Sequence, residues 1–296
     1  MKTSTKAALT LGGFLGFQYF RCQKALKQSL IRLQGYANKH IDLSYGQMSY
    51  VDVGQGEVIL SLHGIFGGYD QSYQVTKSLK DSYRLLCPSR FGYLESDVKG
   101  QGTPKEQAEA LLELLDALEI DQVFLYGISA GGTSTLRFAL DYPERVKGII
   151  LHSSAMPYVQ KQEYEYKYNP SNNIFINNFT LNLMEPFFKS AMGLTSEAIQ
   201  SIMPVQDRKE GVIIDSSISN PDMARHFDDY PIENLNKPVL IFQAIDDKLI
   251  NYRHTLAVEP RFPNAELILF DSGGHLMIGN EHEIDTEVRD FIEAHK

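Results

Sequence analysis

The chain has 296 residues, of which 43% are hydrophobic and 22% are charged, a composition typical of globular proteins. This composition excludes a disordered chain, and two cysteines, Cys22 and Cys87, are too few for a disulfide scaffold. The formal net charge of −9 argues against nucleic acid as a partner, because attraction to phosphates needs a basic surface. A protein with several membrane spans is also excluded, since no uncharged apolar run reaches the roughly 18 residues of a spanning helix.

The charge is distributed unevenly along the chain. Residues 1–40 contain seven Lys or Arg and no Asp or Glu, so all 37 acidic residues lie in the rest of the chain. Within this basic segment, residues 7–20 form an uncharged apolar run between Lys6 and Arg21. The run is too short to span a bilayer comfortably and has the length of a signal-peptide core or an interfacial segment. No cleavage site of small residues follows it.

A helix is predicted next, over residues 22–34, with Leu26, Leu30 and Leu33 on one face. An apolar anchor followed by a polybasic helix is a combination that holds proteins on anionic membrane leaflets. Residues 1–34 are therefore expected to place the protein at a membrane surface. The alternative is a cytoplasmic protein whose N-terminal helix packs on its own domain.

From residue 41 the pattern changes to short apolar strands that alternate with helical stretches, which is typical of a parallel α/β sheet. Ile41–Tyr45 and Met48–Val53 are predicted to form a hairpin at one edge. Further strands are expected at Glu57–Leu62, Tyr83–Cys87, Gln122–Tyr126, Lys147–His152, Pro238–Gln243 and Glu266–Phe270. Helices are expected over residues 103–118, 130–141 and 284–294. Thr103, followed by Pro104, is the expected N-cap of the first of them.

Between residues 155 and 232 the alternation stops, in a stretch rich in Tyr, Phe, Asn and Met. An insertion of this size within a regular α/β alternation is expected to be a helical cap or lid rather than a separate domain. The predicted organisation is therefore a basic segment at residues 1–40, an α/β core at residues 41–154 and 233–296, and a cap at residues 155–232.

A candidate nucleophile follows the predicted strand Gln122–Tyr126. The sequence Gly-Ile-Ser-Ala-Gly at residues 127–131 matches Gly-x-Ser-x-Gly and lies between a strand and a helix. Such a turn is sharp and strained, and it needs glycine where a Cβ would collide with neighbouring backbone. It is expected to present the Ser129 hydroxyl at the carboxyl edge of the sheet, beside a helix N-terminus that favours developing negative charge. The alternative is a glycine-rich turn with a capping serine.

A serine nucleophile needs a base that takes its proton and an acid that orients the base, in the chain order Ser, Asp or Glu, His for this kind of turn. The predicted strand Pro238–Gln243 runs into the adjacent acids Asp246 and Asp247. The strand Glu266–Phe270 runs into a glycine-rich loop that contains His275. Because parallel strands end at the same edge of a sheet, both loops can reach the serine. His275 is therefore the predicted base, and either aspartate is a candidate for the acid.

An oxyanion site is predicted in the loop after the strand Glu57–Leu62. The loop reads His-Gly-Ile-Phe-Gly-Gly at residues 63–68, and backbone N–H groups in such a loop can stabilise a developing oxyanion. The expected donors are the N–H groups of Ile65 and Ala130. His63 is expected to be a structural residue of this loop, and the alternative for the whole feature is a plain glycine loop.

Together these features resemble the α/β-hydrolase superfamily over about residues 41–296. The matching segments are His63-Gly64-Ile65, the Gly-x-Ser-x-Gly turn, the strand-end acid, Gly273-Gly274-His275 and the loop Pro88–Ser96. The resemblance implies an eight-stranded, mostly parallel sheet flanked by helices, with a helical cap inserted after the sixth strand. It also implies that Asp247 is the acid, because a hydrophobic pair, Leu249 and Ile250, follows it. Ala244 departs from the glycine that the family usually has three residues before the acid.

A triad of Ser129, Asp247 and His275 predicts hydrolysis of an ester, or a similar acyl bond, through an acyl-serine intermediate. The expected substrate is a small apolar ester, lipid esters included. No metal or organic cofactor is expected, since the sequence holds no Cys/His cluster and no phosphate-loop motif. Carbon–carbon hydrolysis, perhydrolysis and acyl transfer are alternatives that use the same triad. A non-catalytic small-molecule binding module is a further alternative, because one fold can serve several functions.

Overall fold

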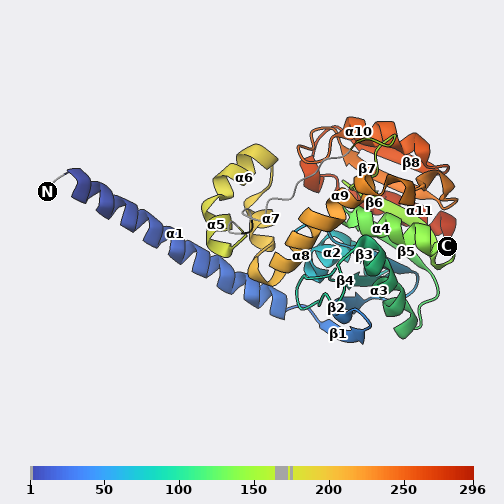
Figure 1. Ribbon diagram of the computed structural model, residues 1–296, viewed down its shortest axis with the longest axis horizontal. Coiled ribbons are helices and arrows are strands. Elements are labelled where there is room, and N and C mark those ends of the chain that lie inside the picture. Colours follow the sequence, from blue (N-terminus) through green and yellow to red (C-terminus); the bar gives the residue numbers. More distant parts are fainter. Residues whose placement is uncertain (1–2, 164–172, 174–175) are drawn as a thin grey trace. The chain divides into compact units, whose positions relative to one another are not determined.

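The computed structural model describes residues 3–163, 173 and 176–296 (Figure 1). The chain divides into two compact units, the first within Met1–Tyr36 and Pro170–Gln206, the second within Ala37–Asn169 and Asp207–Lys296. The expected cap is therefore shared between the units, and only its middle part belongs with the N-terminal segment. Residues 164–172 and 174–175 of the expected cap, like residues 1–2, lie outside the described residues.

The second unit is built on one eight-stranded sheet with the strand order β1-β2-β4-β3-β5-β6-β7-β8. The two pairs that β2 makes are antiparallel, and the other neighbouring pairs are parallel. The strands are β1 Asn38–Leu43, β2 Gly46–Val53, β3 Val58–Leu62, β4 Arg84–Pro88, β5 Val123–Ile128, β6 Val146–His152, β7 Val239–Ala244 and β8 Ala265–Phe270. The predicted α/β fold with a mostly parallel sheet and an edge hairpin is confirmed.

Every residue of the central strands β3 and β5 is buried, which is why these strands are largely apolar rather than alternating. The helices of this unit are α2 Tyr69–Thr76, α3 Pro104–Ala117, α4 Gly131–Asp141, α8 Lys209–Ile214, α9 Asn220–Arg225, α10 Tyr252–Val258 and α11 Glu281–His295. The predicted start of α3 is confirmed. The hydroxyl of Thr103 accepts the N–H of Glu106, and the Glu106 carboxylate accepts the N–H of Thr103 in return.

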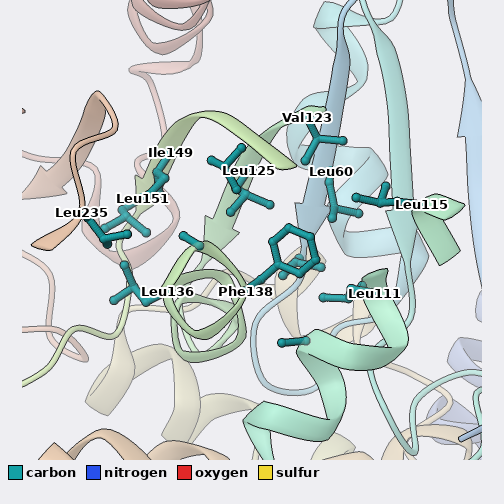
Figure 2. Close-up of a cluster of buried hydrophobic side chains, with 14 of the residues drawn as sticks. Leu60, Leu111, Leu115, Val123, Leu125, Leu136, Phe138, Ile149, Leu151 and Leu235 are labelled. Carbon is teal, nitrogen blue, oxygen red and sulfur yellow. The ribbon is translucent and has the colours of Figure 1, made fainter. Parts of the chain in front are cut away.

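The core on one side of the sheet fixes the strands that carry the candidate site. Figure 2 shows Leu111 of α3 and Phe138 of α4 near Leu60 of β3 and Leu125 of β5. None of these side chains is more than 2% exposed, and burial of each stabilises the fold by about 1.5–3 kcal/mol. This packing therefore fixes the carboxyl ends of β3 and β5 relative to each other. The predicted oxyanion loop follows β3, and Ser129 follows β5.

The first unit contains one long N-terminal helix and three short helices of the expected cap. Helix α1 spans Thr3–Gln34, so the predicted helix at residues 22–34 is the C-terminal half of a longer one. The short helices are α5 Asn178–Leu183, α6 Glu185–Met192 and α7 Ser196–Ser201, which we call the cap helices. Among the residues that the structure describes, no helix is both long enough and apolar enough to cross a membrane.

Helix α1 contacts the cap helices through a different face from the predicted leucine face. Cys22, Ala25 and Ser29 are buried, whereas Leu30 is 44% exposed. Small side chains allow the helices to approach closely, and polar contacts then fix the pairing. Arg21 forms an ion pair with Glu185 at 3.1 Å. Further along α1, Ser29 donates to the Gln200 carbonyl and Arg32 to those of Ser201 and Met203.

Candidate active site

Ser129 lies at the sharp turn between β5 and α4, in a left-handed conformation with a φ of 49°. Its N–H donates to the His152 carbonyl, and its own carbonyl accepts the N–H groups of Gly132 and Ala155. The turn requires glycine at residue 131, as the sequence predicts. A Cβ there would lie 2.3 Å from the Leu62 carbonyl oxygen, so any side chain would push the turn away from the end of β3.

The structure brings the three predicted side chains together from three loops at the carboxyl edge of the sheet. Nε2 of His275 lies 2.9 Å from Oγ of Ser129, and Nδ1 of His275 lies 2.9 Å from Oδ2 of Asp247. Asp247 follows β7 and His275 follows β8, where Gly273 and Gly274 have φ values of 128° and 62°. These left-handed residues turn the loop back toward the serine, a conformation that glycine adopts without strain.

The Asp247 carboxylate is fully buried and fully hydrogen-bonded. Oδ1 accepts the N–H groups of Leu249 at 2.7 Å and Ile250 at 3.0 Å, while Oδ2 accepts from Gln243 as well as facing His275. Burial by itself would raise the pKa of this carboxyl, but the bonds from His275 and the two amides outweigh burial and lower the pKa. The ionised carboxylate holds the proton of a neutral imidazole on Nδ1, which leaves Nε2 free to accept one.

The neighbouring Asp246 has a different position. Its carboxylate accepts the N–H groups of Gly274 at 2.8 Å and Gly273 at 3.4 Å. Asp247 is therefore the aspartate that contacts the imidazole, and Asp246 is the one that holds the backbone of the His275 loop. The two adjacent acids act on the same loop, one through the ring and one through the backbone.

The loop after β3 lies directly against the serine. A Cβ placed on Gly64 would be 3.0 Å from Cβ of Ser129, so only glycine permits this approach. The N–H of Gly64 donates to Oε1 of Gln71 at 2.7 Å, and the Gly64 carbonyl accepts the N–H of Gly67. Within the described part of the chain, the N–H groups of Ile65 and Ala130 have no protein acceptor. These two donors are available to a ligand.

Two buried ion pairs hold this loop, and sequence reasoning missed both. Arg90 pairs with Asp215 through contacts of 2.6 and 2.5 Å, and its Nε donates to the His63 carbonyl at 2.9 Å. Arg208 pairs with Asp70 at 3.0 and 2.8 Å and also donates to the Gly67 carbonyl. The side chains in both pairs are at most 2% exposed.

The two arginines therefore bind the loop at the carbonyls of His63, its first residue, and Gly67, near its end. Arg90 lies in the segment Pro88–Ser96, which the sequence marks only through its resemblance to a loop of the family. Arg208 and Asp215 lie in the stretch without periodicity, where no local pattern marks a buried charge. A buried charge is recognisable only from its partner, and these partners are far away in the sequence.

His63 and His152 flank the site as neutral rings. Burial, followed by the nearby Arg90 charge, lowers the pKa of His63 well below its usual value. Its Nε2 accepts the N–H of Arg90, so Nδ1 donates to the Gly64 carbonyl and His63 is the structural loop residue that the sequence predicts. Burial, and then the electrostatic interaction with His275, lowers the pKa of His152 to about 4, and Nδ1 of His152 lies 2.9 Å from the Tyr126 hydroxyl.

Two cavities of the second unit adjoin the loops that carry His275 and Asp247. One, of about 330 Å³, is bordered by His275 and His152 and by apolar side chains that include Val75, Ile128, Leu276 and Ile284. The other, of about 300 Å³, adjoins the loop after Asp247 and is lined by residues that include Met156, Tyr158, Met223 and Ile250. Among the described residues, no three His, Cys, Asp or Glu side chains gather so that they could hold a metal ion.

Comparisons with known proteins show what this chain is similar to. An uncharacterized hydrolase, YcgS, of Bacillus subtilis (strain 168) is 29% identical to this chain over 281 residues, which cover 84% of the chain and 96% of that protein. A 2-hydroxy-6-oxo-6-phenylhexa-2,4-dienoate hydrolase of Burkholderia cepacia is 25% identical over 272 residues, covering 83% of the chain and 88% of that enzyme. The fold is similar to that of a thermophilic esterase from Thermogutta terrifontis, with a TM-score of 0.67, 21% identity, and coverage of 88% of this chain and 99% of that one.

The family model for the α/β hydrolase fold matches residues 57–281, from the start of β3 to the start of α11. This segment includes the turn that carries Ser129, the loop that carries Asp247, the loop that carries His275, and all the strands that pair in parallel. The match covers most of the chain, and the two curated relatives named above are both described as hydrolases. The chain therefore belongs to the α/β hydrolase fold family.

Proposed function

We propose that this protein is a serine hydrolase that cleaves esters through an acyl-Ser129 intermediate. The observation that carries the proposal is the pair of 2.9 Å hydrogen bonds that link Asp247, His275 and Ser129 in series. A serine hydroxyl is a weak nucleophile until a base takes its proton, and this arrangement offers both the base and the acid that orients it.

The reaction follows from this arrangement. His275 Nε2 takes the proton of Ser129 as Oγ attacks the carbonyl carbon of the ester, and the Asp247 carboxylate stabilises the resulting imidazolium. The N–H groups of Ile65 and Ala130 donate to the oxyanion. The bond to the leaving alcohol then breaks, and Nε2–H gives its proton to the alcohol oxygen. Water repeats both steps on the acyl-serine, which releases the carboxylic acid and restores the hydroxyl.

The oxyanion site is proposed to be set before the substrate arrives. Donors stabilise a transition state most when they need not reorganise, and removal of one such donor costs about 10²–10³ in rate. The carbonyls of His63 and Gly67 are bound by Arg90 and Arg208, which leaves little freedom for the Ile65 peptide between them. Arg90 and Arg208 are accordingly positioning residues in this proposal.

The proposed substrate is an ester with an apolar acyl or aryl group. The cavity beside His275 has about 330 Å³, within the size range of small-molecule pockets, and its border includes the aliphatic side chains Val75, Ile128, Leu276 and Ile284. The second cavity contributes methionine side chains, which adapt to apolar groups of different shapes. Both features favour an apolar group over a charged one.

Carbon–carbon bond hydrolysis is the second candidate. The observation that favours it is the similarity over most of the chain to a 2-hydroxy-6-oxo-6-phenylhexa-2,4-dienoate hydrolase. The same Ser129 and His275 would serve either reaction, so the substrate and not the triad separates them.

Activity profiling of the purified full-length protein tests the function. A series of p-nitrophenyl esters of increasing acyl length is compared with a dienone substrate, and Ser129→Ala is the control for both. Ester hydrolysis that Ser129→Ala abolishes supports the proposal, and turnover of the dienone without ester cleavage would favour the second candidate. Failure of a fluorophosphonate probe to label Ser129 would contradict both reactions and favour a binding module.

We also propose that the enzyme resides at a membrane surface through residues 1–34. The support is the basic charge of this segment together with the apolar run at residues 7–20. Fractionation of cells that express the full-length protein tests this location. Recovery of the protein in the cytoplasmic fraction alone would support the alternative that α1 serves only to pack on the cap helices.

A further inference from the structure

Residues 12–20 of helix α1 have apolar side chains on all sides of the helix. Residues 12–20 precede the part that packs on the cap helices, and Figure 1 shows this part extending beyond them. Phe14, Phe17, Tyr19 and Phe20 are 49%, 60%, 58% and 68% exposed. An α-helix that is apolar all round is normally buried, so this segment needs a partner that can surround it.

The cap helices add exposed apolar side chains beside this segment. Leu183, at the end of α5, is 36% exposed, and Phe187, in the first turn of α6, is 57% exposed. Both lie within two residues of Glu185, whose carboxylate binds Arg21 of α1 at 3.1 Å, and Arg21 directly follows Phe20. The ion pair therefore places apolar side chains of α1 and of the cap helices around one point.

The charge around this point identifies the partner. Residues 1–40 contain no acidic side chain, and Lys24 and Lys27 are exposed one and two turns after Phe20. Aromatic side chains flanked by lysines fit the boundary of an anionic phospholipid bilayer, where rings enter the headgroup region and ammonium groups meet lipid phosphates. A protein partner would have to present both an apolar pocket and a matching acidic rim.

We propose that α1 and the cap helices bind an anionic bilayer together, as one surface formed by Phe14, Phe17, Phe20, Leu183 and Phe187 with Lys24 and Lys27. The cap is then part of the membrane-binding element instead of a lid that is independent of it. This inference rests on the proposed membrane residence and not on the chemistry of Ser129. It assigns to α5 and α6 a lipid contact that the charge pattern of residues 1–34 does not predict.

Co-sedimentation of the full-length protein with vesicles tests the proposal. Phosphatidylcholine vesicles are compared with vesicles that also contain phosphatidylserine. We expect the paired variants Phe17→Ser with Phe20→Ser, and Leu183→Ser with Phe187→Ser, each to weaken partitioning at least about tenfold. Lys24→Gln with Lys27→Gln should reduce the preference for phosphatidylserine about tenfold. The matched control is Leu256→Ser, which removes a 43% exposed leucine from α10 in the other unit and should leave partitioning unchanged.

Normal partitioning of the Leu183→Ser, Phe187→Ser variant would overturn the role of the cap helices. Absence of binding by the unaltered protein to either vesicle would overturn membrane residence as well. Concentration-dependent self-association that these substitutions abolish, without vesicle binding, would assign the surface to a second copy of the chain. Circular dichroism shows whether each variant is folded, and hydrolysis of a short water-soluble ester reports the proposed function separately.

Discussion

Arg90 and Asp215 form a fully buried, bidentate ion pair across 125 residues of sequence, and Arg90 also donates to the carbonyl of His63, the first residue of the proposed oxyanion loop. The Tyr93 hydroxyl donates to the same aspartate at 2.5 Å. Asp215 thus both neutralises the charge of Arg90 and fixes the orientation of its guanidinium. Loss of one partner would leave an uncompensated charge in the core beside the proposed site.

For Asp215→Asn we expect unfolding to become easier by about 3–5 kcal/mol, because the Arg90 charge loses its counter-ion. We also expect a fall in kcat that exceeds any change in KM, since the loop that presents the Ile65 N–H loses its anchor. Urea unfolding and steady-state kinetics on the folded variant measure the two effects. The control is Asp141→Asn, which breaks the partly exposed pair with Arg137 and should cost at most about 0.5 kcal/mol. A stability loss with unchanged kcat would show that Asp215 does not position the loop.

Replacement of Ser129 by Ala should lower turnover by about 10⁴–10⁶ while leaving the urea midpoint close to that of the parent protein. The reason is that the acyl bond cannot form without Oγ, whereas alanine adopts the same backbone conformation as serine. Rates with p-nitrophenyl esters and labelling by a fluorophosphonate probe check this outcome. Near-normal activity of the variant would refute Ser129 as the nucleophile.

The two adjacent aspartates should differ sharply when each is changed to asparagine. Asp247→Asn removes the charge that orients His275 and should lower kcat by about 10⁴. Asp246→Asn only weakens the bonds to the Gly273 and Gly274 amides, and displacement of the loop should cost no more than about 10². Parallel kinetics on both variants decide the point, and a larger loss for Asp246→Asn would reverse the assignment.

Acid should destabilise the fold through His152. The pKa of this buried ring falls from 6.5 to about 4, so the unfolded chain binds one more proton than the folded chain between these values. The contribution of the neutral His152 ring to the free energy of unfolding is therefore fully present above pH 6.5, and it is lost as the pH falls toward 4. For His152→Gln, the free energy of unfolding should drop about 2 kcal/mol less than in the parent between about pH 7 and about pH 4.5. Equal drops in both proteins would contradict a buried neutral His152.

Local pattern was enough to predict the architecture and two of the three side chains that the structure brings together, Ser129 and His275. Apolar runs placed the strands near their observed positions, and Thr103 with Pro104 placed the start of α3, because caps and buried strands are decided by neighbours in sequence. The strand-turn-helix setting of Ser129 and the glycine loop before His275 were legible for the same reason. Each depends on backbone geometry within a few residues.

Tertiary structure decided what depends on distant partners. The sequence did not distinguish Asp246 from Asp247 by position alone; the hydrogen bonds to the ring and to the loop backbone separate them. The helical repeat of α1 predicted a leucine face, yet the small residues Ala25 and Ser29 are the ones buried, because the choice of face depends on what the cap helices present. The Arg90–Asp215 and Arg208–Asp70 pairs left no local trace, since a buried charge is compensated only by a residue that the fold brings to it.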